Sequence, residues 1–112
     1  MLKKINRFEK KRDFEEVMDK GILIQSPFFG LKIIKNGDEK KFGFVISKKI
    51  SKKAVVRNKI KRLLAEVVRK ILIDSEWKGK AIFLVKKRAL EADTNDLEKE
   101  IRRVLNDEKS YS

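Results

Sequence analysis

A chain of 112 residues has the length of one compact domain and is too short for two. Its 30 lysines and arginines outnumber its 17 aspartates and glutamates, and the net charge of +13 favours a polyanionic partner, nucleic acid before an anionic membrane. Cysteine and histidine are absent, which excludes disulfides, thiol and imidazole catalysis, and zinc sites built from these residues.

The sequence shows no membrane-spanning or secretory segment. No apolar run approaches the roughly 18 residues of a spanning helix, and the opening residues, MLKKINRFEKKRD, lack the apolar stretch of a signal peptide. We therefore expect a cytoplasmic protein without a membrane partner, and the absence of cysteine is compatible with that reducing compartment.

The first predicted element is a short helix that begins at Asp13. Asp13 and Glu16 have the spacing of a capping box, in which two side chains satisfy the free amides at the start of a helix. Phe14 and Val17 then share one face, and Gly21 is placed to end the helix.

Three predicted strands follow, over residues 22–25, 28–35 and 41–47. Asn36-Gly37 separates the second strand from the third, and Asn-Gly between β-type runs is the strongest short hairpin signal, because both turn positions tolerate positive φ. We therefore expect these two strands to pair directly. The pair would carry its apolar side chains on one face, namely Phe29, Leu31 and Ile33 opposite Phe42 and Phe44 or their neighbours.

A basic connector, residues 48–53, leads into a predicted amphipathic helix that opens with AVVRNKIKRLLAEVVR, residues 54–69. At about 100° per residue, one arc of this helix is apolar and forms the predicted core face, made of Ile60, Leu63, Leu64, Val67 and Ile71. The opposite arc is predicted to be exposed and carries Asn58, Arg62, Ala65 and Arg69.

The charge of this region is one-sided. Between Ser47 and Lys70 ten cations stand against one acid, Glu66, a net +9 of the chain's +13. A helix selected only for solubility normally interleaves both signs, and cations near a helix N-terminus oppose the helix dipole. A helix whose cations serve only solubility remains the alternative. A phosphate partner would turn the unfavourable interaction of these cations with the helix dipole into a favourable one, since free amides and cations would face the same anion.

The remaining elements are a strand and a helix. Residues 81–85, AIFLV, have the length of a buried strand, and Trp77 just before it is expected to pack in a loop. A second capping box, Asn95 to Glu98, is expected to begin the last helix, and the tail from about residue 107 to 112 is expected to fray. The order αβββαβα indicates a single α+β domain, residues 1–112, with helices packed on a mixed sheet.

The stretch SKKISKKAVVRNKIKRLLAEVVRK resembles the signature of the bacterial ribonuclease P protein component, in which a small, basic connector precedes Ala-x-x-Arg-Asn-basic-aliphatic-Lys-Arg. The resemblance extends over about Asn6 to Leu105 and includes FGFVISKK before the connector and VKKR after the last strand. Ser51, Lys59, Ala65 and Met18 depart from the usual pattern, the last standing where a second aromatic is frequent beside Phe14.

This resemblance implies a left-handed crossover through the basic helix and a role as the protein subunit of the endoribonuclease that removes the 5′ leader from precursor tRNA. It also implies that cleavage and its Mg²⁺ ions belong to the RNA subunit. No catalytic side chain, metal site or small-molecule substrate is then expected of the protein. The expected partners are the ribonuclease P RNA and precursor tRNA.

Two binding surfaces are implied by the same resemblance. The surface for the catalytic RNA consists of Lys48, Lys49, Lys52, Lys53, Arg57, Asn58, Lys59, Lys61, Arg62 and Arg69. The surface for the single-stranded leader consists of Phe14, Lys32, Phe44, Lys48, Lys86 and Arg88. Core packing is the alternative for Phe14 and Phe44, and capping of the helix is the alternative for Asn58.

Two other functions stay open at this point. A general RNA chaperone or ribosome-associated protein would use the same charge without a dedicated partner. A self-sufficient nuclease is disfavoured, because the sequence has no histidine or cysteine and no cluster of acids among its basic residues.

Overall fold

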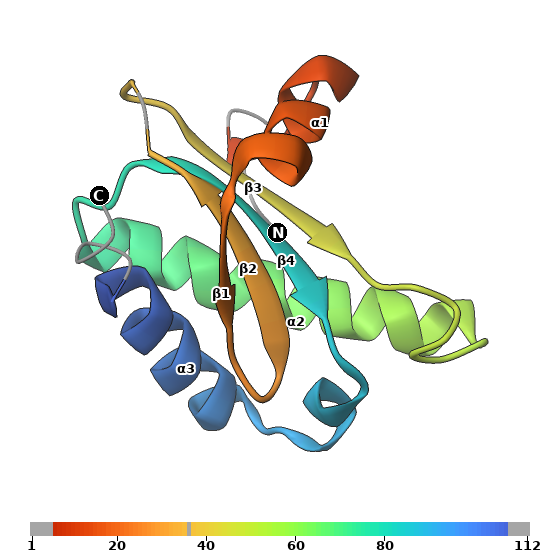
Figure 1. The fold of residues 1–112 in the computed structure, drawn as a ribbon. Coiled ribbons are helices and arrows are strands. Elements are labelled where there is room, and N and C mark those ends of the chain that lie inside the picture. The colour runs from red at the N-terminus through yellow and green to blue at the C-terminus, as the bar shows by residue number, and fades with distance from the viewer. Residues whose placement is uncertain (1–5, 36, 108–112) are drawn as a thin grey trace.

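The structure is a computed structural model that describes residues 6–35 and 37–107 (Figure 1). Within these ranges the predicted order αβββαβα is confirmed, with one additional 3₁₀ helix before the last helix. The elements are α1 (Lys11–Lys20), β1 (Ile22–Gln25), β2 (Phe29–Ile34), β3 (Lys40–Val45), α2 (Ala54–Asp74), β4 (Gly79–Val85), η2 (Lys87–Glu91) and α3 (Thr94–Asp107). The expected frayed tail lies outside the described residues, apart from the end of α3.

The four strands form one mixed sheet in the order β1-β2-β4-β3. β2 is antiparallel to both β1 and β4, whereas β3 is parallel to β4. The predicted hairpin between β2 and β3 is therefore wrong, although Gly37 does adopt the positive φ of a turn, at 72°. β4 is inserted between the two strands, because its apolar run is buried on both faces and takes a central position, where both of its edges are hydrogen-bonded.

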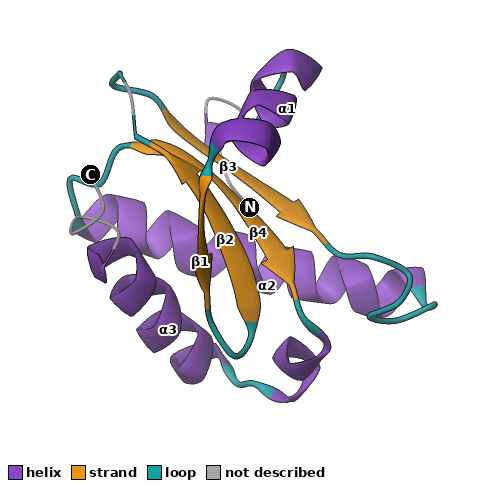
Figure 2. Ribbon diagram, viewed as in Figure 1, coloured by secondary structure: helices purple, strands orange, loops and turns teal. Residues whose placement is uncertain are grey.

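Helix α2 connects the parallel neighbours β3 and β4. In Figure 1 both strands point to the lower right, β3 lies to the right of β4, and α2 passes behind the sheet. A crossover with this geometry is left-handed, as the resemblance implies, whereas nearly all such connections are right-handed. In this strand order β3 is an edge strand, and the basic connector follows it directly (Figure 2).

The main core lies between the sheet and the pair α2 and α3. The predicted core face of α2 is confirmed for four of its five members, Leu63 being only partly buried. Ala65, predicted on the exposed arc, is buried at 6% exposure, so this prediction is wrong. The buried face of α2 is wider than the predicted arc, since Ala65 and Val68 join the predicted residues in the main core.

Helix α1 covers the other face of the sheet. Val17 of α1 and Ile82 of β4 are both fully buried there, outside the main core. The helix begins at Lys11 without a side-chain cap, so the predicted capping box is wrong. Asp13 instead lies in the first turn, 4.0 Å from the amine of Lys80. The predicted end at Gly21 is confirmed, since the Gly21 N–H donates to the carbonyl oxygen of Val17 at 2.8 Å.

The last helix begins earlier than its predicted capping box. The carboxylate of Asp93 accepts a hydrogen bond from the N–H of Asp96 at 2.8 Å, so Asp93 caps α3 in place of Asn95. Trp77 packs as predicted, with 6% exposure and its ring 5.2 Å from that of Phe42. No helix in the described part of the chain is long and apolar enough to cross a membrane.

Candidate nucleic-acid interface

A groove of about 670 Å³ runs along the outer edge of β3, between α1 and the first half of α2. We call it the β3 groove. Its floor is Gly43, with Phe42 and Phe44 beside it, and aromatic and cationic side chains form its two walls. Its lining contains three cations and no carboxylate, and consists of Arg7, Phe8, Phe14, Phe42, Gly43, Phe44, Val55, Asn58, Lys61, Arg62 and Ala65.

The wall on the α1 side is aromatic. The rings of Phe8 and Phe14 meet edge to face, with centroids 5.6 Å apart and an interplanar angle of 84°. Both rings rest on the backbone of Gly43, because a β-carbon at that position would lie 3.1 Å from a carbon of each ring. Glycine at 43 therefore allows two aromatic rings to sit directly on the sheet.

Residues 6–8 were not predicted to take part in the site. Arg7 forms an isolated parallel bridge with Phe42, and the side-chain amide of Asn6 donates to the carbonyl oxygen of Lys40 at 2.8 Å. These contacts hold Phe8 against the outer edge of β3. The one sequence signal for this was an aromatic residue placed alone within a strongly basic segment.

The wall on the α2 side is cationic. Asn58, Lys61 and Arg62 are exposed and line the groove, and no side-chain hydrogen bond or ion pair joins them to another residue in the described ranges. The N-cap of α2 is Lys53, without a side-chain cap, so Asn58 does not cap the helix. The first turn of α2 contains no acid, and its cations therefore oppose the helix dipole uncompensated.

The other cations predicted to bind the catalytic RNA fall into two groups. Arg57 is half-buried and donates to the carbonyl oxygen of Ser51 at 2.8 Å, so it ties the connector to α2. Arg69 pairs with Glu66 at 3.1 Å, one turn along the helix. The remaining five have exposed side chains that make no side-chain hydrogen bond or ion pair among residues 6–35 and 37–107, and they are Lys48, Lys49, Lys52, Lys53 and Lys59.

The residues predicted to bind the leader do not all meet. Phe14 and Phe44 both line the β3 groove, although Phe44 lies on the core face of β3 with its ring stacked 5.5 Å from that of Phe83. Lys32 lies under α1, where its amine donates to the carbonyl oxygen of Met18. None of the predicted lysines from β2 or from the end of β4 lines this groove.

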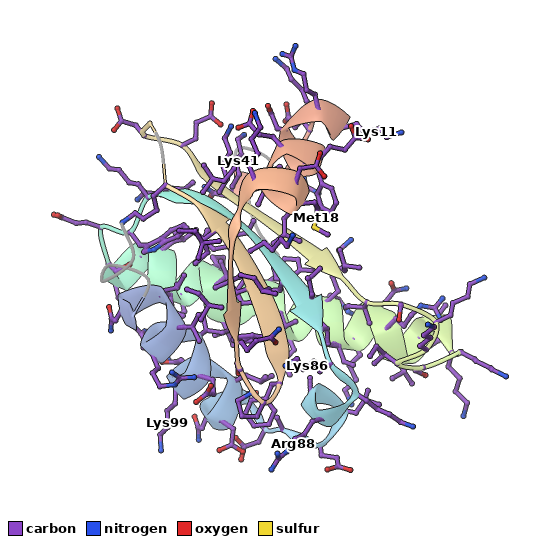
Figure 3. All side chains as sticks on the ribbon, viewed as in Figure 1. Lys11, Met18, Lys41, Lys86, Arg88 and Lys99 are labelled. Carbon is purple, nitrogen blue, oxygen red and sulfur yellow. The ribbon has the colours of Figure 1, made fainter. Side chains whose placement is uncertain are left out.

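The two predicted residues that follow β4 lie beyond the end of the sheet. The amine of Lys86 donates to the carbonyl oxygen of Ser26 at 2.8 Å, and Arg88 is exposed in η2 (Figure 3). Lys48 and Lys86 follow the carboxyl ends of adjacent parallel strands, so these two amines lie at the same end of the sheet.

Carboxylates of α3 are matched to cations outside the groove. Hydrogen bonds from Lys70 and then from Arg102 hold the pKa of Glu98 below its ordinary value. Within the described ranges no three acidic side chains come together to hold a metal ion.

The ribonuclease P family model matches residues 2–109, nearly the whole chain. The chain belongs to the ribonuclease P protein family. Among curated relatives, the ribonuclease P protein component of Microcystis aeruginosa is 32% identical over 111 residues, covering 93% of this chain and 91% of that protein. The component from a Nitratiruptor species is 35% identical over 104 residues and covers 93% of each chain.

Solved structures of the family share the fold. The ribonuclease P protein of Staphylococcus aureus matches with a TM-score of 0.79 and 27% identity, covering 97% of this chain and all of that chain, 100%. The Thermotoga maritima protein matches with a TM-score of 0.77 and 26% identity, covering 88% and 94% of the two chains. As a ribonuclease P protein component, this chain is part of a tRNA-processing endoribonuclease complex and partners the ribonuclease P RNA.

Proposed function

We propose that this protein binds the catalytic RNA of ribonuclease P and the 5′ leader of precursor tRNA at once, and that it assists the Mg²⁺-dependent removal of the leader by the RNA. The observation that carries this proposal is the β3 groove, where an aromatic wall faces a cationic wall. Aromatic rings together with cations hold single-stranded RNA without reading its sequence, because every base has a face to stack and every nucleotide a phosphate.

In the groove, the leader's bases stack against the aromatic wall while its phosphates meet the cationic wall. Arg62 can fork onto two phosphate oxygens, whereas Lys61 acts as a point charge. Asn58 both donates and accepts hydrogen bonds, so it can contact a base edge or a sugar hydroxyl. These three residues therefore serve the leader, in addition to any contact with the catalytic RNA.

The exposed lysines outside the groove serve the catalytic RNA. Lys49, Lys52 and Lys53 lie on the connector and Lys59 on α2, all with solvent-exposed side chains. Folded RNA presents phosphates at high density, and lysines on a flexible stem meet them without strict geometry. Arg57 supports this surface from within, because it fixes the connector to the start of α2.

The cleavage step is assigned to the RNA subunit and its Mg²⁺ ions. Metal ions in such a site polarise the scissile phosphate and generate the attacking hydroxide. The protein's part is to hold the leader and to neutralise phosphates, so that fewer free metal ions are needed to fold and load the RNA. We place this complex in the cytoplasm.

The decisive experiment is reconstitution at low Mg²⁺ with precursor tRNA. The protein alone should not cleave, the RNA alone should cleave slowly, and the two together should process the substrate efficiently. Equal processing with and without protein at every Mg²⁺ concentration would refute the proposal. Cleavage by protein stripped of RNA would support a self-sufficient nuclease instead.

Competition separates this proposal from a general RNA chaperone. A chaperone that works by charge alone should bind unrelated structured RNAs as tightly as the ribonuclease P RNA at the same salt concentration. The β3 groove favours a dedicated partner, because a chaperone of this kind has no need of paired aromatic rings beside its cations. A clear preference for ribonuclease P RNA would support the proposal.

A further inference from the structure

We infer that Phe8 is a nucleobase-stacking residue, and that together with Phe14 it forms a corner that holds one base of the leader. This inference rests on the proposed function and adds to it a residue that lies before the first helix. Phe8 is only partly buried and lines the β3 groove, so part of its ring is open to a ligand.

The geometry of the two rings creates the corner. Their planes stand at 84° to each other, so they present two nearly perpendicular aromatic surfaces. A base placed in the corner can stack on one ring while its edge meets the other, and both arrangements are favourable for aromatic groups. Lys61 and Arg62 line the opposite wall and can hold the phosphates on either side of that base.

The corner is held in place before any ligand arrives. Arg7 bridges to Phe42, and the side chain of Asn6 donates to the Lys40 carbonyl oxygen, so the segment that carries Phe8 is fastened to β3. Gly43 gives both rings a common support at 3.1 Å from where its β-carbon would be. A site that is already ordered loses less conformational entropy on binding.

The other candidate for a second contact on α1 is Met18, four residues after Phe14. It does not line the β3 groove, and Figure 3 places its side chain beneath the far end of α1. Its backbone carbonyl accepts the amine of Lys32. The second aromatic surface in this chain therefore comes from Phe8, on the opposite side of Phe14 in the sequence.

The test uses the reconstituted holoenzyme and precursor tRNAs that each carry one 2-aminopurine in the leader, because the fluorescence of this base is quenched when it stacks. Phe8→Leu keeps an apolar side chain but removes the ring, Phe8→Tyr keeps the ring, and Met18→Leu is the matched control on α1. The measured quantity is the affinity for precursor tRNA divided by that for leaderless tRNA. Dividing by the affinity for leaderless tRNA removes any loss of affinity that the two substrates share.

Phe8→Leu should lower the ratio by about 5- to 150-fold and remove the quenching at one leader position, since stacking on one ring is lost. Phe8→Tyr and Met18→Leu should retain both signals. An unchanged ratio in Phe8→Leu, or loss of quenching in Met18→Leu alone, would overturn the inference while leaving the proposed function intact. Failure of the wild-type protein to promote processing at low Mg²⁺ would instead overturn the proposed function.

Discussion

The cations of α2 should govern the salt dependence of RNA binding, and replacing three of them with glutamine tests this directly. Lys59, Lys61 and Arg62 are exposed and form no ion pair with an acidic side chain among the residues that the structure describes. The triple variant lowers the net charge from +13 to +10 and leaves the buried face of α2 unchanged. Glutamine keeps the helix propensity of these positions close to that of lysine and arginine.

The size of the effect follows from counterion release. Each lost phosphate contact reduces the slope of log affinity against log salt by about 0.7 for single strands and about 0.9 for duplex, so three contacts reduce it by about 2 to 3. At 0.1 M salt, one decade below 1 M, this corresponds to a loss of affinity of roughly 100- to 500-fold. Near 1 M salt the variant and the wild type should bind almost equally.

A matched control distinguishes a binding surface from diffuse charge. Replacing Lys11, Lys20 and Lys99 with glutamine also lowers the net charge to +10, but removes exposed cations from α1 and α3. Figure 3 labels Lys11 and Lys99. We expect this control to change the salt slope by less than one unit in filter binding to ribonuclease P RNA. Equal slopes for the two triple variants would refute the assignment of a surface, and loss of helical circular dichroism in the α2 variant would show that these charges serve the fold.

Three further predictions concern the fold that supports the groove. Hydrogen bonds from Arg103 and then from Ser26 hold the pKa of Glu100 below its ordinary value, so this stabilisation is present above the glutamate range and lost as pH falls through the lowered pKa. Glu100→Gln should therefore cost about 1 kcal/mol of unfolding free energy at neutral pH, with a difference from wild type that shrinks in acid melts. Gly21→Ala should cost about 1 to 3 kcal/mol in denaturant titrations, because its β-carbon would lie 2.5 Å from a backbone oxygen of α1. Lys32→Met should lower the thermal unfolding temperature and leave the affinity for the leader nearly unchanged, because the Lys32 amine donates to the end of α1. Loss of leader affinity without loss of thermal stability would restore Lys32 as a leader contact.

Local patterns were sufficient to predict the elements. The 3.6-residue repeat of α2 identified Ile60, Leu64, Val67 and Ile71 as core, and all four are buried. The same repeat misplaced Ala65, because the periodicity of one helix does not show how much of its circumference the rest of the fold covers; Ala65 belongs to the main core and lines the β3 groove. Caps were predicted less well: α1 begins at Lys11 without a side-chain cap, and Asp93 caps α3 two residues before the predicted Asn95.

Strand order was beyond the reach of local pattern. Gly37 does take the positive φ of a turn, yet the strands on either side of it, β2 and β3, are not neighbours. A turn reports only that the chain reverses, whereas pairing depends on which strand gains most from a central position. The run AIFLV in β4 is more apolar than the sequence of β3. The free energy gained by burying both faces of β4 outweighs the smaller entropy cost of closing the short loop of a local hairpin.

The β3 groove is a consequence of that strand order. With β4 in the centre, β3 becomes an edge strand, and its outer side is free to receive the segment that carries Phe8. The same edge strand runs directly into the connector and α2, so the basic start of the helix lies along the opposite wall. Had β3 paired with β2 as well as with β4, β4 instead of β3 would stand at this edge. The aromatic and cationic walls therefore face each other only because a distant strand, β4, is inserted between β2 and β3. For this reason residues 6–8 and 58–62 could be predicted as separate basic segments, but not as two sides of one site.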